Sequence, residues 1–452
     1  MRGRCRTAGG RRTKAWRGRP ARAVRRGAAT LALGLSIAGV PGQAMALPAL
    51  PAAAAAPGSY GFAEAATGIE GARSTADAEP LAPGRSYRSS LPSSARVSYR
   101  LDLDATTNAY VSVTAVPPPG SSVSVVDGLK VSVQDAEGNS CSVDTTTFGA
   151  ARSPHPLAAW GMREISPGKS LCREAGAYYV SVERADPKGE GSSPDTWQLE
   201  LLAVTEPRTA KAGATGAPQA WDSATPEPLR GDAEQRDGGA GFAGATPLDQ
   251  GVWREELRPG QTVFYAVPVD WGQQLSVTAD LGGSGSGGTG YASDALEVTL
   301  YNPARGHVAR LGVGYDGDRK SGSLPPLPPV DHANRNSPLA QTGALRFAGS
   351  YYLVAHLSES VADSFGDGPF PMTLRVKVSG TAQAGPDYAG TSDPAGLFDV
   401  SEEDREAADG VPGGDDTALR LVAVSGIGTG SALLVGLGVW TLLARRRSAA
   451  PR

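Results

Sequence analysis

The feature that most constrains the fold of this 452-residue chain is an internal duplication. Six blocks of sequence recur in the same order with a shift of roughly 165 to 175 residues, and self-similarity at one period indicates a repeated structural unit. Residues 112–115 (SVTA), for example, recur identically as residues 276–279. The shift changes only between blocks, where loops lengthen. We therefore expect two copies of one domain.

The repeated blocks alternate apolar and polar residues with a period of two, as in residues 263–269 (VFYAVPV) and 373–378 (TLRVKV). Such alternation is typical of a strand that has one face in a core and the other in water. Turns rich in Gly and Pro separate these runs, which agrees with the 59 Gly and 35 Pro of the whole chain. Since no helical period lies between the strands, the pattern predicts an all-β protein with two tandem antiparallel β-sandwiches.

The second copy also resembles a known bacterial family. Its blocks are, in chain order, residues 257–261 (LRPGQ), Phe264 with Tyr265, residues 272–277 (GQQLSV), residues 296–303 and residues 349–353 (GSYYL). This order resembles the bacterial pre-peptidase C-terminal domain, and the first copy resembles it more weakly because Ser93 and Ser94 replace the Pro-Gly turn. The resemblance implies jelly-roll-like sandwiches that accompany secreted proteins, with a binding or stabilising role and no catalytic residues to transfer.

Both ends of the chain are typical of a membrane-anchored export protein. An Arg-rich stretch, an apolar run and the small residues Ala44 and Ala46 predict a cleaved signal peptide. The pair Arg25-Arg26 leaves the Sec and twin-arginine routes both open. Residues 421–444 carry no charge and are long enough to cross a bilayer core of roughly 30 Å. The basic residues that follow should stay cytoplasmic, which makes this a single-pass cell-membrane protein with an extracellular N-terminal ectodomain.

The remaining segments are rich in Gly, Ala and acidic residues and are predicted to be spacers. The expected order is a signal peptide (1–46), a flexible N-terminal segment (47–79), the first sandwich (80–206), a linker (207–245), the second sandwich (246–380), an acidic stalk (381–420), the transmembrane helix (421–444) and a cytoplasmic tail (445–452). The acidic run at residues 401–406 could instead form a short amphipathic helix or a docking patch.

The charges are segregated along the chain, although the formal net charge is only −3. Without the 11 basic residues of positions 1–26 and the four at the C-terminal end, the chain has 28 basic and 46 acidic residues. Nucleic acid is therefore not an expected partner. Cys141 and Cys172 remain after signal cleavage and most simply form one disulfide in an oxidising compartment. Two free thiols or a metal site are the alternatives.

Residues that could bind a ligand are few. Trp253, Trp271 and Tyr315 are candidate contacts to a sugar or protein surface, but each could equally belong to a core. Asp316 and Asp318 offer paired carboxylates in a loop. Calcium needs six to eight oxygen ligands, so calcium is at most a possible cofactor and no other cofactor is expected.

The motifs of enzymes are missing from the sequence. No Gly-x-Ser-x-Gly, His-Glu-x-x-His or Cys-x-x-Cys motif occurs, and the four histidines are scattered. We predict no enzymatic activity. The alternative is a hydrolase whose site is assembled from residues distant in sequence and includes His356. However, His356 lies in a predicted strand, where it is better explained as a packed residue.

Together these features predict a non-enzymatic cell-surface binding or structural protein that presents two sandwiches outside the membrane. Its partner would be a cell-wall polymer or an envelope protein. The alternative is an accessory subunit of an envelope secretion or proteolytic complex. The Ala-rich composition, with Arg in excess over Lys, suits an actinobacterial source.

Overall fold

The computed structural model describes residues 59–409, apart from residues 167–168, 187, 189, 212–219, 225–226, 228 and 286. The predicted signal peptide, transmembrane helix and cytoplasmic tail lie outside the described residues. Within the part that is described, no helix has both the length and the apolar character needed to cross a membrane.

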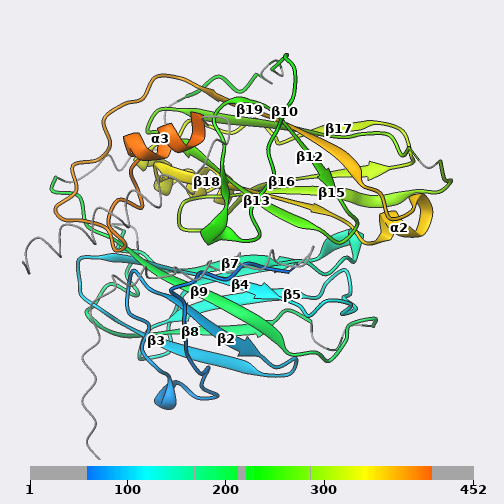
Figure 1. Ribbon diagram of the computed structural model, residues 1–452. Helices are drawn as coiled ribbons and strands as arrows, with labels where there is room; N and C mark the ends of the chain where they lie inside the picture. Colours follow the sequence, from blue (N-terminus) through cyan, green and yellow to red (C-terminus); the bar gives the residue numbers. More distant parts are fainter. Residues whose placement is uncertain are drawn as a thin grey trace, which may run out of the picture. The chain divides into compact units, whose positions relative to one another are not determined.

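The first sandwich combines a five-stranded sheet, in the order β1-β2-β9-β4-β7, with a four-stranded sheet in the order β3-β8-β5-β6 (Figure 1). Its strands are β1 (Thr67–Gly68), β2 (Ser86–Leu91), β3 (Arg96–Leu103), β4 (Asn108–Val116), β5 (Gly128–Gln134), β6 (Ser140–Thr147), β7 (Leu157–Arg163), β8 (Gly176–Arg184) and β9 (Trp197–Glu206).

The second sandwich has two five-stranded sheets, in the orders β10-β12-β19-β14-β17 and β11-β13-β18-β15-β16 (Figure 1). Its strands are β10 (Glu234–Gln235), β11 (Thr246–Pro247), β12 (Gly251–Leu257), β13 (Thr262–Val269), β14 (Gln274–Leu281), β15 (Ala292–Tyr301), β16 (His307–Tyr315), β17 (Lys320–Ser323), β18 (Gly349–Leu357) and β19 (Phe370–Ser379).

Helices are short and lie between strands or after the last one. They are the 3-10 helices η1 (Thr75–Asp77), η2 (Gly149–Ala151), η3 (Phe242–Gly244) and η4 (His332–Asn336), and the α-helices α1 (Ala340–Ala344), α2 (Ser360–Phe365) and α3 (Glu402–Asp409). The protein is thus built mainly of β-sheets, as the period-two alternation predicted.

The duplication seen in the sequence is repeated in the strand registers. Tyr99 pairs with Val180 between β3 and β8, and the corresponding Tyr265 pairs with Leu353 between β13 and β18. The longer strands pair antiparallel, as expected, whereas the two-residue strands β1, β10 and β11 pair in parallel with β2, β12 and β13. Because β1 and β10 occupy equivalent places, each repeat begins earlier in the chain than the repeated blocks indicated.

Each sandwich has its own apolar core between its two sheets. Tyr99 and Trp197 are fully buried in the first core, and Tyr265 and Tyr351 take similar positions in the second. The glycine before each Tyr-Tyr pair has a positive φ, 156° at Gly176 and 126° at Gly349. Residues with a Cβ atom are disfavoured at such φ values, which explains why both copies have glycine at this position.

Parts of the expected spacers pack against the sandwiches. Phe242, in the expected linker, is 3% exposed and lies against Phe264 of β13. In the expected stalk, Phe398 is 1% exposed, and the acidic run forms α3, in which Ala408 is buried and Arg405 donates to Asp270. The run is therefore a short helix, which was the alternative to a spacer. The overall composition of these segments did not reveal the contacts, because only a few apolar residues in each segment are buried against a sandwich.

Cys141 and Cys172 form a disulfide, as the cysteine count predicted, with 5.7 Å between their Cα atoms. The bond joins β6 to the segment that precedes β8. Both residues contact the core of the first sandwich. Because their sulfurs are joined to each other, neither is available as a metal ligand.

Candidate functional site

The three aromatic residues proposed as ligand contacts are buried in the core of the second sandwich. Trp253, Trp271 and Tyr315 are 9%, 6% and 0% exposed. The Trp253 indole donates to the Asp249 carbonyl at 3.0 Å, and the Tyr315 hydroxyl donates to the Gly282 carbonyl at 2.8 Å. Their rings therefore have the core role that the sequence left open and present no aromatic face to a ligand.

Of the two loop aspartates, Asp316 has its carboxylate held by protein groups. Asp316 accepts a hydrogen bond from Lys320 at 2.7 Å, and this bond lowers the pKa of the Asp316 carboxyl below its ordinary value. The backbone amide of Asp318 donates a hydrogen bond to the other carboxylate oxygen of Asp316 at 3.2 Å. Among the residues that the structure describes, no group of three or more His, Cys, Asp or Glu is placed to hold a metal ion.

The structure instead brings together residues of the two sandwiches, along a contact that we call the seam. Two apolar clusters of the seam contain residues from both copies. Tyr110 of β4 lies edge-on to Phe347 at 5.2 Å between ring centroids, and Tyr60 lies edge-on to Phe264 at 5.7 Å. The two sandwiches therefore share buried apolar surface.

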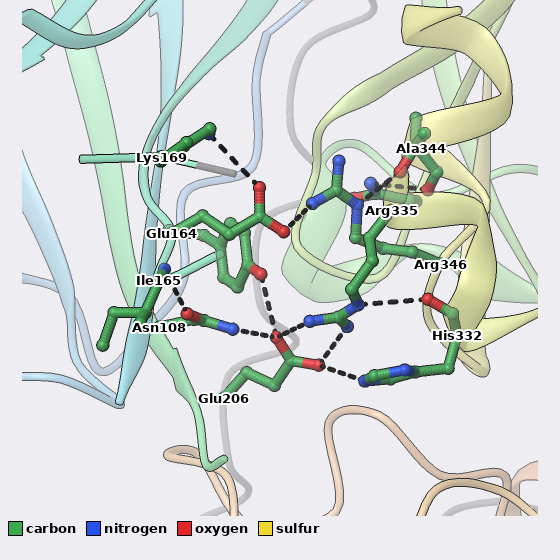
Figure 2. A network of polar contacts seen from close by, with 12 residues as sticks. Asn108, Glu164, Ile165, Lys169, Glu206, His332, Arg335, Ala344 and Arg346 are labelled. Carbon is green, nitrogen blue, oxygen red and sulfur yellow. Dashed lines mark hydrogen bonds and ion pairs between the residues drawn. The ribbon is translucent and has the colours of Figure 1, made fainter. Parts of the chain in front are cut away.

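Among the described residues, three buried carboxylates of the first sandwich pair with arginines of the second across the seam. The pairs are Glu200–Arg305 at 2.5 Å, Glu206–Arg335 at 2.6 Å and Glu164–Arg346 at 2.6 Å. Figure 2 shows the last two pairs and the groups around them. In these three pairs the first sandwich supplies the negative charge and the second sandwich the positive charge.

The Glu206 carboxylate receives several further donors. Asn108 of β4 donates to one of its oxygens at 2.9 Å (Figure 2). The Tyr110 hydroxyl, also of β4, donates to the same oxygen at 2.9 Å, and the Tyr388 hydroxyl donates to the other at 2.8 Å. Burial alone would raise the pKa of Glu206, but the Arg335 charge and these hydrogen bonds outweigh it and lower the pKa to about 2. The carboxylate is therefore ionised at neutral pH and acts as the centre of this network.

All four histidines of the chain lie along the seam, although they are scattered in the sequence. The rings of His155 and His356 stack at 4.4 Å across it, His332 lies 3.9 Å from the Glu206 carboxylate, and His307 borders a hollow between the copies. Burial, and then the neighbouring Arg335, lower the pKa of His332 to about 4. Burial and the adjacent His155 also hold the pKa of His356 well below its ordinary value.

One contact resembles the start of a catalytic site. The Ser153 hydroxyl lies 2.8 Å from Nε2 of His356, as a nucleophile and its base would. However, both residues are 2% exposed, and Ser153 also accepts from the Glu359 amide at 3.0 Å. The other ring nitrogen of His356 meets the Thr262 hydroxyl at 2.9 Å, where a catalytic triad would have a carboxylate. The contact is closed to a substrate and joins the two copies.

A polar hollow of about 250 Å³ opens along the same seam. Its lining includes Asp144 and three threonines of β6 from the first sandwich, and Glu297, His307 and Arg310 from the second. Burial raises the pKa of Asp144 and lowers that of His307. These side chains can hydrogen-bond a small polar molecule.

Sequence reasoning missed the seam, although one signal was present. Glu200 interrupts the apolar run of β9, where neighbouring residues such as Leu199 and Leu201 are fully buried, and it is itself fully buried. A carboxylate in the middle of a buried strand requires a partner, but the partner, Arg305, is 105 residues away.

Comparisons with known proteins do not place the chain in a family. No family model matches, and no curated protein matches. A tandem pair of CBM22 domains from Xyn10C of Paenibacillus barcinonensis is similar at a TM-score of 0.18 and 11% identity, over 64% of this chain and 84% of that one. A putative secreted protein from Parabacteroides distasonis has a TM-score of 0.17 and 8% identity, over 64% and 82%. At these TM-scores the likeness carries no argument about function.

Proposed function

We propose that this protein is a non-enzymatic cell-surface binding or structural protein whose two sandwiches act as one joined unit outside the membrane. The observation that carries the proposal is the seam, where three buried carboxylates of the first copy pair with arginines of the second. A buried charge that loses its partner costs several kcal/mol, so separation of the sandwiches would be expensive. The unit is suited to presenting fixed surfaces to a wall polymer or an envelope protein.

The surroundings of the histidines support a role without catalysis. The Ser153–His356 contact is enclosed, and the pKa of His356 lies well below its ordinary value because of burial. A general base needs access to its substrate and a pKa near the working pH. Each histidine is better explained as a polar contact within the protein.

Export and anchoring belong to the same proposal. The Cys141–Cys172 disulfide fits an oxidising compartment, and the signal peptide and the span at residues 421–444 follow from sequence. We also include a relationship of each sandwich to the pre-peptidase C-terminal domain, which rests on the repeated blocks.

The test has two parts and uses the full chain. In intact cells, added protease should degrade the ectodomain while the C-terminal tail stays protected. The detergent-solubilised protein should then co-sediment with isolated bacterial cell walls. Failure to sediment, combined with a specific cross-link to another envelope protein in cells, would favour the accessory-subunit alternative. Protection of the whole chain from protease would overturn the proposed location.

A further inference from the structure

A second hollow, of about 390 Å³, lies on the sheet β10-β12-β19-β14-β17 of the second sandwich. The other sheet of this sandwich carries Phe264 and His356, which meet the first sandwich. Three arginines from different parts of the chain border it: Arg254 of β12, Arg319 before β17 and Arg375 of β19. We call this site the arginine hollow.

The arginines outnumber the carboxylates that border the hollow. Asp280 of β14 is 5% exposed and accepts hydrogen bonds from both Arg319, at 2.5 Å, and Arg375. One carboxylate therefore orients two guanidinium groups. A guanidinium has five N–H donors, and Asp280 takes up one from each arginine. Each guanidinium therefore keeps N–H donors that Asp280 does not use.

The arginines differ in how open they are to solvent. The side chains of Arg319 and Arg254 are 64% and 51% exposed, whereas that of Arg375 is 20% exposed. Arg254 also has a partner beside the hollow, Glu256, at 2.5 Å. At the seam, by contrast, each arginine meets a buried carboxylate one to one, which leaves no excess of positive charge.

The basic surface continues along the same sheet. Arg375 also borders a neighbouring depression, together with Lys377 and the hydroxyl residues Ser276 and Thr278. The one carboxylate in its lining, that of Glu227, is paired with Arg230 at 2.5 Å. Arg375 and Lys377 are two residues apart on β19 and therefore project from one face about 7 Å apart. A polymer with regularly spaced anionic groups would meet more than one of these side chains. Such a surface is unexpected on a chain whose middle part is acidic.

We propose that the arginine hollow binds the phosphate groups of an anionic envelope polymer. Planar guanidinium groups match phosphate oxygens with paired hydrogen bonds, and prior orientation by Asp280 reduces the entropy lost on binding. This inference rests on the proposed binding function and narrows its ligand class.

The experiment measures binding of inorganic polyphosphate to the full chain in detergent, with polyglutamate of similar charge as the carboxylate comparison. The double variant Arg254→Gln/Arg319→Gln should weaken polyphosphate binding at least tenfold. Asp280 keeps Arg375 in this variant, so its thermal unfolding should match that of the unmodified protein. The matched control is Arg96→Gln, at an exposed pair on the first sandwich, which should leave binding unchanged.

Each other outcome is informative. Absence of polyphosphate binding, equal loss in the control, or equally strong binding of polyglutamate would overturn the phosphate site. Wall co-sedimentation of the same proteins separates the two proposals. If the double variant still sediments with walls like the unmodified protein, the binding function stands and the arginine hollow is not its site. If neither protein sediments but polyphosphate binding is lost in the variant, the site stands and the wall-binding function fails.

Discussion

The carboxylate of Glu200 in β9 lies 2.5 Å from the guanidinium of Arg305, in the turn between β15 and β16, and the two side chains are 0% and 6% exposed. Glu200 also accepts from the Tyr60 hydroxyl at 3.2 Å and from the Ala63 amide at 2.9 Å. One carboxylate thus connects the N-terminal segment, the first sandwich and the second sandwich.

We expect Arg305→Met to lower the free energy of unfolding by about 3 to 5 kcal/mol, because it leaves the Glu200 charge buried without its partner. The double variant Glu200→Gln/Arg305→Met should lose clearly less than the sum of the two single variants, since it removes both charges. Chemical denaturation measures both effects. Arg96→Ala, at a pair whose side chains are 55% and 27% exposed, is the control and should cost less than about 1 kcal/mol. Additive losses would contradict the coupling.

The Glu206 carboxylate should make stability depend on acid. Its pKa falls from 4.5 to about 2 on folding, so its contribution is fully present above pH 4.5 and is lost as the pH falls through 2. The difference corresponds to about 3 kcal/mol. Glu206→Gln should lower stability at pH 7, because Arg335 loses its ionised partner, and should flatten the dependence below pH 4.5. A variant with the same acid dependence as the unmodified protein would rule this out.

His332 should make the stability depend on pH in a higher range than Glu206 does. Proximity to Glu206 alone would raise its pKa, but burial and Arg335 outweigh this and lower it from 6.5 to about 4. The folded state therefore resists protonation that the unfolded chain accepts, and stability should decrease as the pH falls from 6.5 to 4. His332→Gln should reduce this decrease. An NMR titration of the His332 ring should have its midpoint near pH 4, and a midpoint at or above 6.5 would contradict the expected environment.

The fold was largely predictable because the duplication and the period-two alternation are local properties of the sequence. Residues 112–115 and 276–279 lie on equivalent strands, and Val113 pairs with Leu201 as Val277 pairs with Val376. Identical spacing of apolar residues produced the same register twice. Strand position, however, did not decide whether an aromatic residue such as Tyr315 faces the core or the solvent.

The seam was not predictable because its partners come from different repeats. Arg305 and Arg346 lie in connections beside strands, where a charged residue normally faces water. Their burial follows from how the second sandwich meets Glu200 and Glu164, and no local pattern encodes that contact. The arginine hollow was missed for a similar reason. Pairing of β12, β19, β14 and β17 brings Arg254, Arg375 and Arg319 together, and spacing along the chain does not.

The disulfide should stabilise chiefly the first sandwich. Cys141 and Cys172 are 31 residues apart, and closure of a loop of this length contributes on the order of 3 to 4 kcal/mol in the chain-entropy model. Cys141→Ser/Cys172→Ser should lower the free energy of unfolding by about this amount. Reduction of the unmodified protein should have the same effect, measured by denaturation with and without a reductant. A stability unchanged by either treatment would show that the bond is not structural.

Close approach at the seam should depend on Gly306, which lies against the ring of Trp160 from the first sandwich. A Cβ atom at Gly306 would come within 2.4 to 2.7 Å of three atoms of that ring. Because Trp160 is 6% exposed and stacks on Tyr110 at 5.6 Å, it has little room to move. Gly306→Ala should therefore cost about 1 to 3 kcal/mol, as overpacking does.

The loss should be accompanied by a red shift of tryptophan fluorescence as Trp160 becomes hydrated. Gly244→Ala is the matched control, since a Cβ there meets no atom within 4 Å and the residue has no positive φ. Replacing Trp160 by Phe in the Gly306→Ala background should recover part of the stability by removing the second ring. If Gly306→Ala and Gly244→Ala behave alike, the two sandwiches do not meet tightly at this point, and close approach at Gly306 does not stabilise the seam.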